Sequence, residues 1–125
     1  MTTTAASKQA LGAYGEDVAA RHLVEQGMVL LDRNWRSPGD PVGEIDLVCK
    51  DGDALVVCEV KTRTGEEGGT PHEAVDAEKL DRLQRLGARW ATQRGCTPPE
   101  TRVDLVAVLR PLKGAAIVEH VRGIG

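Results

Sequence analysis

The sequence predicts an α/β fold, a mixed β-sheet flanked by helices with the element order α-β-β-β-α-β-β. Apolar residues recur at helical spacing over residues 8–26 and again over residues 73–94. Between these segments, two strand-like runs flank an Asp-Gly dipeptide at residues 51–52, which is a strong hairpin signal. Beyond the second helical segment, residues 102–110 alternate as a strand does. A strand that follows a helical crossover runs parallel to the strand it left, so the sheet is expected to be mixed.

The composition is that of one soluble globular domain. The chain has 125 residues, of which 41% are hydrophobic and 28% charged. We expect residues 1–9 to form a flexible N-terminal tail and residues 10–125 to form a single domain. No apolar run approaches the roughly 20 residues of a membrane span, and the N-terminus lacks the apolar segment of a secretory signal. The protein is therefore expected in the cytoplasm, without membrane contact.

The first helix, expected over residues 8–26, carries an apolar stripe with Glu16 at its edge. Glu16 is either an ordinary exposed carboxylate or a side chain that faces a site beside the sheet. A first strand follows over residues 28–36, and the Pro- and Gly-containing segment 37–41 ends it. Trp35, in that strand, is either a core residue or part of a basic and aromatic patch for a nucleic-acid strand.

The hairpin sets the positions of most charged candidates. We expect residues 51–52 to form its two-residue turn, which sets Asp46 opposite Val57. Alternation along both strands then places four charged side chains on one face: Glu44, Asp46, Glu59 and Lys61. The opposite, core-facing side carries Ile45, Cys49, Cys58 and Val60. In this register the two cysteines lie too far apart along the strands for a disulfide.

The carboxylates of this hairpin predict a metal ion. Carboxylates held close together repel one another, and the repulsion raises a pKa unless a cation lies between them. We therefore expect that the fold needs a divalent ion to tolerate this patch. Two carboxylates with few other protein ligands suit Mg²⁺ (or Mn²⁺), which keeps several waters and takes substrate phosphate oxygens as ligands. A structural zinc site is not expected, because the three cysteines show no metal-ligand spacing.

After the hairpin, residues 62–72 are glycine-rich and aperiodic, and they are expected to form a loop at the rim of the site. The second helix carries a basic stripe opposite its apolar face: Lys79, Arg82, Arg85 and Arg89. This stripe is either a solvated face or a surface that positions phosphates. Strands over residues 102–110 and 115–122 close the chain, and Asp104 is expected to pair with an arginine or to support the site.

Asp46, followed by Glu59-Val60-Lys61, resembles the D…ExK signature of the restriction-endonuclease-like nuclease superfamily. Further segments extend the resemblance: Gly15-Glu16, Arg33-Asn34-Trp35-Arg36, Gly43-Glu44-Ile45-Asp46-Leu47, Glu59-Val60-Lys61-Thr62-Arg63, Ala74-Val75 with Lys79, and Arg102-Val103-Asp104. Over roughly residues 10–122, the chain resembles the bacterial YraN-type family, which is similar to archaeal Holliday-junction resolvases. The resemblance implies a restriction-endonuclease-like fold and divalent-metal-dependent cleavage of DNA, including branched or junction DNA.

The hairpin and the resemblance together assign roles. Asp46 and Glu59 are the expected metal ligands, with the Val60 carbonyl as a third oxygen. Glu16 is expected to bind a second ion or a water, and Lys61 to position the attacking water. The expected nucleic-acid contacts are Arg33, Arg36, Arg63 and Lys79. Because the net charge is −3, the positive potential for nucleic acid has to be local rather than global.

Two alternatives stay open beside the nuclease hypothesis. The chain could be a nucleic-acid-binding or partner-recruiting domain that keeps a nuclease scaffold without turnover. It could also be an adaptor that binds only proteins, which predicts no salt-dependent affinity for DNA. A homodimer is expected by analogy alone, because cutting a junction needs two sites in fixed geometry.

Overall fold

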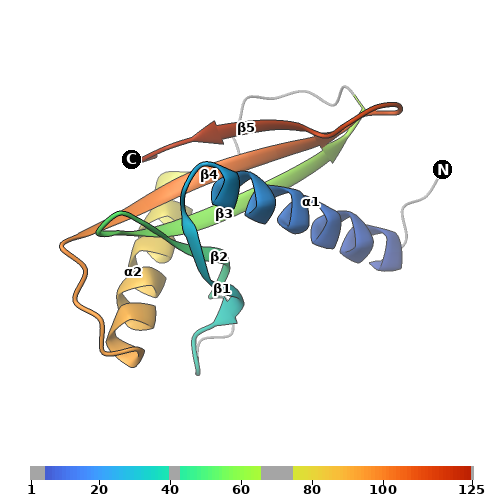
Figure 1. Cartoon of the computed structure of the whole chain (residues 1–125). Helices are drawn as coiled ribbons and strands as arrows, with labels where there is room; N and C mark the ends of the chain where they lie inside the picture. Colours follow the sequence, from blue (N-terminus) through green and yellow to red (C-terminus); the bar gives the residue numbers. More distant parts are fainter. Residues whose placement is uncertain (1–4, 40–42, 66–74, 125) are drawn as a thin grey trace.

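The structure, a computed structural model, describes residues 5–39, 43–65 and 75–124. Its elements are α1 (Ala5–Glu25), β1 (Val29–Arg36), β2 (Glu44–Asp51), β3 (Ala54–Thr64), α2 (Ala77–Gln93), β4 (Glu100–Arg110) and β5 (Ile117–Val121). The predicted order α-β-β-β-α-β-β is confirmed (Figure 1). None of the described helices is long and apolar enough to cross a membrane.

Some boundaries differ from the sequence prediction. Helix α1 begins at Ala5 rather than at residue 8, so part of the expected tail is helical, while the division into tail and domain stays a prediction. Strand β3 continues to Thr64, so residues 62–64 are strand rather than loop. The rest of the expected rim loop, residues 66–72, lies outside the described residues.

The five strands form one sheet in the order β1-β2-β3-β4-β5. Strands β3 and β4 are parallel, and the other three pairings are antiparallel. The parallel pair is joined through α2, as the crossover rule predicts. The centre of the sheet is therefore β3, which has a partner along its length on the β4 side and a shorter pairing with β2.

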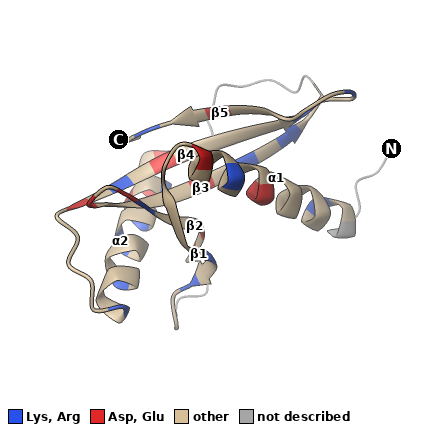
Figure 2. Ribbon diagram, in the orientation of Figure 1, with Lys and Arg blue, Asp and Glu red and all other residues tan. Residues whose placement is uncertain are grey.

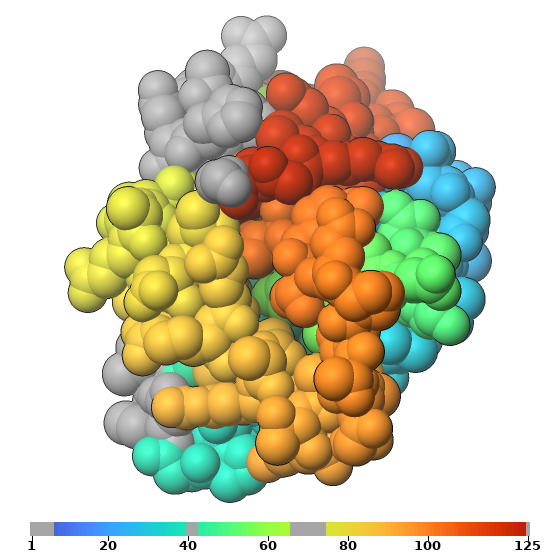
Figure 3. Space-filling view, turned by 90° about the vertical axis from the view of Figure 1, so that its left-hand side faces the viewer, coloured from blue at the N-terminus to red at the C-terminus, as the bar shows by residue number. Residues whose placement is uncertain are grey.

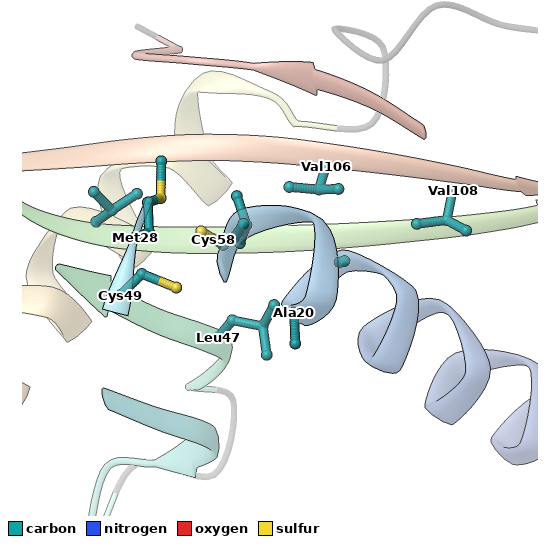
Figure 4. Close-up of a cluster of buried hydrophobic side chains, with 10 residues drawn as sticks. Ala20, Met28, Leu47, Cys49, Cys58, Val106 and Val108 are labelled. Carbon is teal, nitrogen blue, oxygen red and sulfur yellow. The ribbon is translucent and has the colours of Figure 1, made fainter. Parts of the chain in front are cut away.

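The two helices cover opposite faces of the sheet. Side chains of α1, including Leu23, pack against Val56 and Cys58 of β3. Side chains of α2, including Leu86, pack against Val57, which lies between those two residues and points to the other face. Figure 4 shows the core cluster on the α1 side. Burial on both faces explains why β3 reads as a nearly continuous apolar run before it reaches Glu59.

A glycine in each helix permits this close packing on β3. A Cβ added at Gly15 of α1 would lie 1.8 Å from the Oγ1 atom of Thr62. A Cβ added at Gly87 of α2 would lie 2.8 Å from a Cγ2 atom of Val57. The Gly15-Glu16 pair in the sequence thus has a physical reason, because the glycine brings the following glutamate close to the sheet.

The predicted hairpin register is wrong by two residues. Asp51 pairs with Ala54, so the turn consists of Gly52 and Asp53 rather than residues 51–52. Gly52 has a φ of +59° at the first central position, where a type II′ turn requires glycine. Because side chains alternate with period two, an even shift leaves the predicted face of each strand unchanged.

The corrected register brings two thiols together. Cys49 pairs with Val56 and Leu47 pairs with Cys58, so the cysteines are diagonal neighbours on the α1 side (Figure 4). Their thiols share a hydrogen bond, which lowers the pKa of Cys49 and raises that of Cys58. The expectation that they lie far apart along the strands is therefore wrong, although both are free thiols.

Strand β2 is irregular around Asp46. Ile45 packs in the cluster on the α2 side, whereas Leu47 packs on the α1 side, so the expectation that Ile45 shares a face with Cys49 is wrong. Two residues apart in a regular strand would point the same way. On the neighbouring strand, Asn34 has a φ of +54° between the pairs that hold Ile45 and Leu47. Both strands thus leave regular geometry beside Asp46.

Candidate metal centre

Asp46 lies where the backbone ladder between β2 and β3 ends. The last backbone pair is Leu47 with Cys58. One residue further, the Oδ2 atom of Asp46 accepts a hydrogen bond of 2.8 Å from the backbone N–H of Val60. A side-chain carboxylate therefore replaces a strand carbonyl as the acceptor. This contact fixes the position of Asp46 relative to β3.

Glu59 comes from the next strand and is almost completely buried, with 7% of its surface exposed. Its Oε1 atom lies 2.9 Å from the Nζ atom of Lys79 in α2 and 3.9 Å from the Nζ atom of Lys61. Lys61 is two residues beyond Glu59, and alternation puts both side chains on the same side of β3. The buried carboxylate is thus held by lysines from two different elements.

Asp46 and Glu59 line one cavity of about 190 Å³, as the alternation predicts for their side chains. The cavity lies between the sheet and the first turns of α2. Its full lining is Glu44, Asp46, Glu59, Lys79, Arg82 and Leu83. Three carboxylates therefore face two cations of α2 across a small space. Figure 2 shows the basic positions that recur along this helix.

The pKa of Asp46 is raised to about 7. Burial is the largest cause, and the charge of Glu59 is the second. The hydrogen bond from the Val60 N–H opposes them, while the charges of Glu16 and Glu44 add to the rise. In the absence of an added cation, this carboxyl group is therefore about half protonated at neutral pH.

The protein relieves the repulsion among these acids with its own cations. Three carboxylates each have a basic partner: Glu59 with Lys79 at 2.9 Å, Glu44 with Arg36 at 3.1 Å, and Glu16 with Arg33 at 3.7 Å. Asp46 has the N–H of Val60 and a raised pKa instead. The chain thus places cations of its own beside three of these four acids, and the need for a divalent ion stays a prediction.

The donor set nevertheless fits a hard divalent cation. Asp46 and Glu59 offer carboxylate oxygens to the same cavity, and such oxygens are the ligands that Mg²⁺ and Mn²⁺ prefer. Within the described ranges, no three His, Cys, Asp or Glu side chains are arranged as they stand to hold a metal ion. The carboxylate of Glu59 instead accepts a hydrogen bond from the ammonium group of Lys79.

The four predicted nucleic-acid contacts lie in different surroundings. Lys79 is inside the cavity and paired with Glu59. Arg33 binds two carboxylates of α1, with 2.6 Å to Asp17 and 3.7 Å to Glu16, so it ties β1 to that helix. Arg36 and Arg63 are exposed.

Sequence reasoning did not single out Arg82 from the basic stripe as a residue of the site. Arg82 lies three residues after Lys79, so both face the same side of α2, and it lines the cavity. None of the described ion pairs involves it. Figure 3 views the molecule from the α2 side, where this helix (yellow) lies at the surface below β5 (red). The i, i+3 spacing from Lys79 was the available signal.

Asp104 belongs to a separate, structural network. It is fully buried and accepts hydrogen bonds from Arg102 Nε at 2.8 Å and from the backbone N–H of Gly123 at 2.9 Å, and it lies 2.8 Å from His120 Nε2. Burial alone would raise the pKa of Asp104, but these hydrogen bonds hold it below its ordinary value. The predicted pairing with an arginine is confirmed. Its partners show that Asp104 joins β4 to β5 and the C-terminal segment.

Comparisons with known proteins place the chain in a family. The model of uncharacterised protein family UPF0102 matches residues 15–108. A UPF0102 protein of a Nocardioides species is 61% identical over 127 residues and covers 100% of both chains. A UPF0102 protein of Kineococcus radiotolerans is 54% identical over 119 residues, which are 94% of this chain and 95% of that protein.

Among solved structures, the chain is similar to Hjc, a Holliday junction resolvase of Archaeoglobus fulgidus. The TM-score is 0.47 at 18% sequence identity, and the match covers 86% of this chain and 74% of that one. The family match spans most of the chain, and the relatives align over nearly their whole length. The chain therefore belongs to family UPF0102, the YraN-type family that its sequence motifs resemble.

Proposed function

We propose that this protein is a divalent-metal-dependent nuclease that cleaves phosphodiester bonds in DNA, including branched or junction DNA. The observation that carries the proposal is the cavity in which half-buried Asp46 and buried Glu59 face the basic side chains of Lys79 and Arg82. Phosphodiester cleavage needs carboxylates that hold a cation and basic groups that hold the phosphate, and the cavity contains both. Lys61, the lysine of the D…ExK pattern, has its Nζ atom 3.9 Å from the Oε1 atom of Glu59.

In this proposal, Asp46, Glu59 and the Val60 carbonyl hold one Mg²⁺ or Mn²⁺ ion. When bound, that ion supplies charge relief on the phosphate oxygens and a more acidic attacking water. Glu16, whose charge helps to raise the pKa of Asp46, holds a second ion or orients a water. Each basic residue has its own role, which depends on its distance from the cavity.

Lys61 positions the attacking water, because its ammonium group lies 3.9 Å from Glu59 and its side chain is partly exposed to solvent. Lys79 and Arg82 contact phosphate oxygens inside the cavity. Arg36 and Arg63 contact the DNA backbone outside it, since both are exposed. Arg33 is assigned chiefly to holding Glu16 in place.

The test is cleavage by the purified protein of four-way junction, flap, duplex and single-stranded DNA across a titration of Mg²⁺ and Mn²⁺. Asp46→Asn and Glu59→Gln are expected to abolish metal-dependent cleavage. Asp81→Asn is the matched control, because Asp81 is an exposed carboxylate of α2 paired only with Arg85 among the described contacts. Cleavage by either site variant at the wild-type rate would refute the assignment.

A second candidate is a nucleic-acid-binding or partner-recruiting domain without turnover. The favouring observation is that Glu59 is already paired with Lys79 and that the raised pKa of Asp46 reduces its negative charge. Salt-dependent DNA binding without cleavage under any divalent ion supports this candidate.

The nuclease proposal also includes location in the cytoplasm and a homodimer that presents two sites to one junction. Light scattering with and without junction DNA tests the dimer.

A further inference from the structure

Lys79 is held in place at the start of α2. Asp76 caps the helix and accepts a hydrogen bond of 2.8 Å from the backbone N–H of Lys79. The side chain then reaches across to β3, where its Nζ atom lies 2.9 Å from Glu59 Oε1. Only 29% of the Lys79 side chain and 9% of the Glu59 side chain are exposed. This contact is thus a partly buried ion pair between two elements, and it is stronger than an ordinary surface pair.

The ion pair occupies a carboxylate that the proposed function assigns to a metal. A divalent ion on Glu59 would lie within a few ångströms of the Lys79 ammonium group. Like charges at such a distance repel strongly where water is largely excluded. Lys61 lies a further ångström from the same oxygen, with Nζ at 3.9 Å, so the direct competitor of an incoming metal is Lys79.

Within the same cavity, a bound phosphate can take up the displaced ammonium group of Lys79. Arg82 lines the cavity one helical turn further along α2, and none of the described ion pairs involves it. A phosphate group in front of Arg82 would be within reach of the long and flexible Lys79 side chain. One anion would then be bound by two cations of the helix, and Glu59 would be free for the metal.

We propose that Lys79 and a divalent metal ion compete for Glu59, and that a substrate phosphate takes up the displaced Lys79 side chain, so that metal and DNA bind cooperatively. This inference rests on the proposed nuclease function. Without DNA, metal entry has to break the ion pair and leave Lys79 beside a like charge. With a phosphate present, that cost is removed. By thermodynamic reciprocity, the metal raises DNA affinity by the same factor.

The first test is calorimetric titration of Mn²⁺ into DNA-free protein. Lys79→Met removes the competing charge and keeps the apolar length of the side chain, and Mn²⁺ is expected to bind this variant about tenfold more tightly than wild type. Arg82→Met removes a charge from the same cavity without touching Glu59, and Arg85→Met removes one from the same helix, where Arg85 pairs with Asp81. Both controls are expected to change Mn²⁺ affinity less than about threefold.

The second test measures the coupling itself. Affinity for a four-way junction is determined with and without Ca²⁺, used as a divalent probe, in wild type and in Lys79→Met. Ca²⁺ is expected to raise the affinity of wild type, and the rise is expected to be about fivefold smaller in the variant. Circular dichroism checks that each variant is folded.

The outcomes separate this inference from the proposed function. If wild type binds Mn²⁺ but Lys79→Met binds it no more tightly, or Arg82→Met tightens it equally, direct competition is refuted while the nuclease proposal stands. If neither wild type nor Lys79→Met binds Mn²⁺ at millimolar concentration, both proposals fail. An unchanged effect of Ca²⁺ on DNA affinity in Lys79→Met overturns the coupling.

Discussion

The carboxylate of Asp46 accepts a hydrogen bond of 2.8 Å from the backbone N–H of Val60, just beyond Leu47 and Cys58, the last backbone pair between β2 and β3. This relationship puts a carboxyl group with a pKa of about 7 between two strands. It connects the fold to the candidate chemistry, because the same side chain satisfies a strand donor and lines the cavity.

Asp46 is expected to make the metal-free protein less stable as the pH rises. Its pKa is about 7 in the folded state and about 3.9 in an unfolded chain, so folding favours the protonated form. That contribution is fully present below the unfolded pKa and is lost as the pH rises through 7. Between pH 5 and 8, wild type should therefore lose up to about 2.5 kcal/mol of unfolding free energy relative to Asp46→Asn.

Urea unfolding of both proteins in EDTA at several pH values measures this difference directly. Asparagine keeps an oxygen that can accept from the Val60 N–H, so the variant isolates the charge from the hydrogen bond. A difference in unfolding free energy that does not change between pH 5 and 8 would contradict the raised pKa.

Gly15→Ala is expected to destabilise the protein by at least about 1 to 3 kcal/mol, because the new methyl group would overlap Thr62 and push α1 away from β3. The matched control is Gly12→Ala in the same helix, where nothing lies within 4 Å of the added Cβ. That change should stabilise the helix by about 0.5 to 1 kcal/mol. Thermal unfolding followed by circular dichroism compares the two, and equal effects would sink the close-packing argument.

Asn34 is expected to tolerate glycine and to resist β-branched replacement. Its φ of +54° lies in the left-handed region, which asparagine enters more easily than most residues and glycine enters freely. Asn34→Gly should therefore change the unfolding free energy little or raise it, whereas Asn34→Val should lower it by about 1 to 2 kcal/mol. Urea unfolding checks the order of the two variants. A valine variant as stable as the glycine variant would show that the conformation is not required.

Arg102→Met is expected to be strongly destabilising without a direct effect on the cavity. It leaves Asp104, which is fully buried, without its main positive partner, and breaking a buried pair in this way costs about 3 to 5 kcal/mol. Arg122→Met is the control, since half of that side chain is exposed and its contact with Asp51 is 3.6 Å long. The control should cost no more than about 1 kcal/mol. Comparable losses in both variants, measured by urea unfolding, would be the contrary result.

The sequence alone determined the order of the elements and the side of the sheet on which Asp46, Glu59 and Lys61 lie. Both follow from local rules, because helical and strand periodicity are properties of consecutive residues. The residue types Asp, Glu and Lys at this spacing also sufficed to suggest a metal centre. The predicted faces of Asp46, Glu59 and Lys61 were unaffected by the error in the hairpin turn, since a two-residue shift of register does not exchange the two faces of a strand.

Only the tertiary structure decided which cationic side chains pair with the carboxylates of the site. Lys79 meets Glu59 across 20 positions of sequence, and Gly15 lets α1, which carries Glu16, approach Thr62 of β3. The packing of Ile45 against the α2 side and the left-handed conformation of Asn34 were likewise not predicted from the sequence. Contacts of this kind depend on the distances between helices and strands. The residue pattern within a single helix or strand does not specify those distances. Sequence periodicity therefore could not predict the charge state of the cavity, because that state depends on burial and on partners from separate elements.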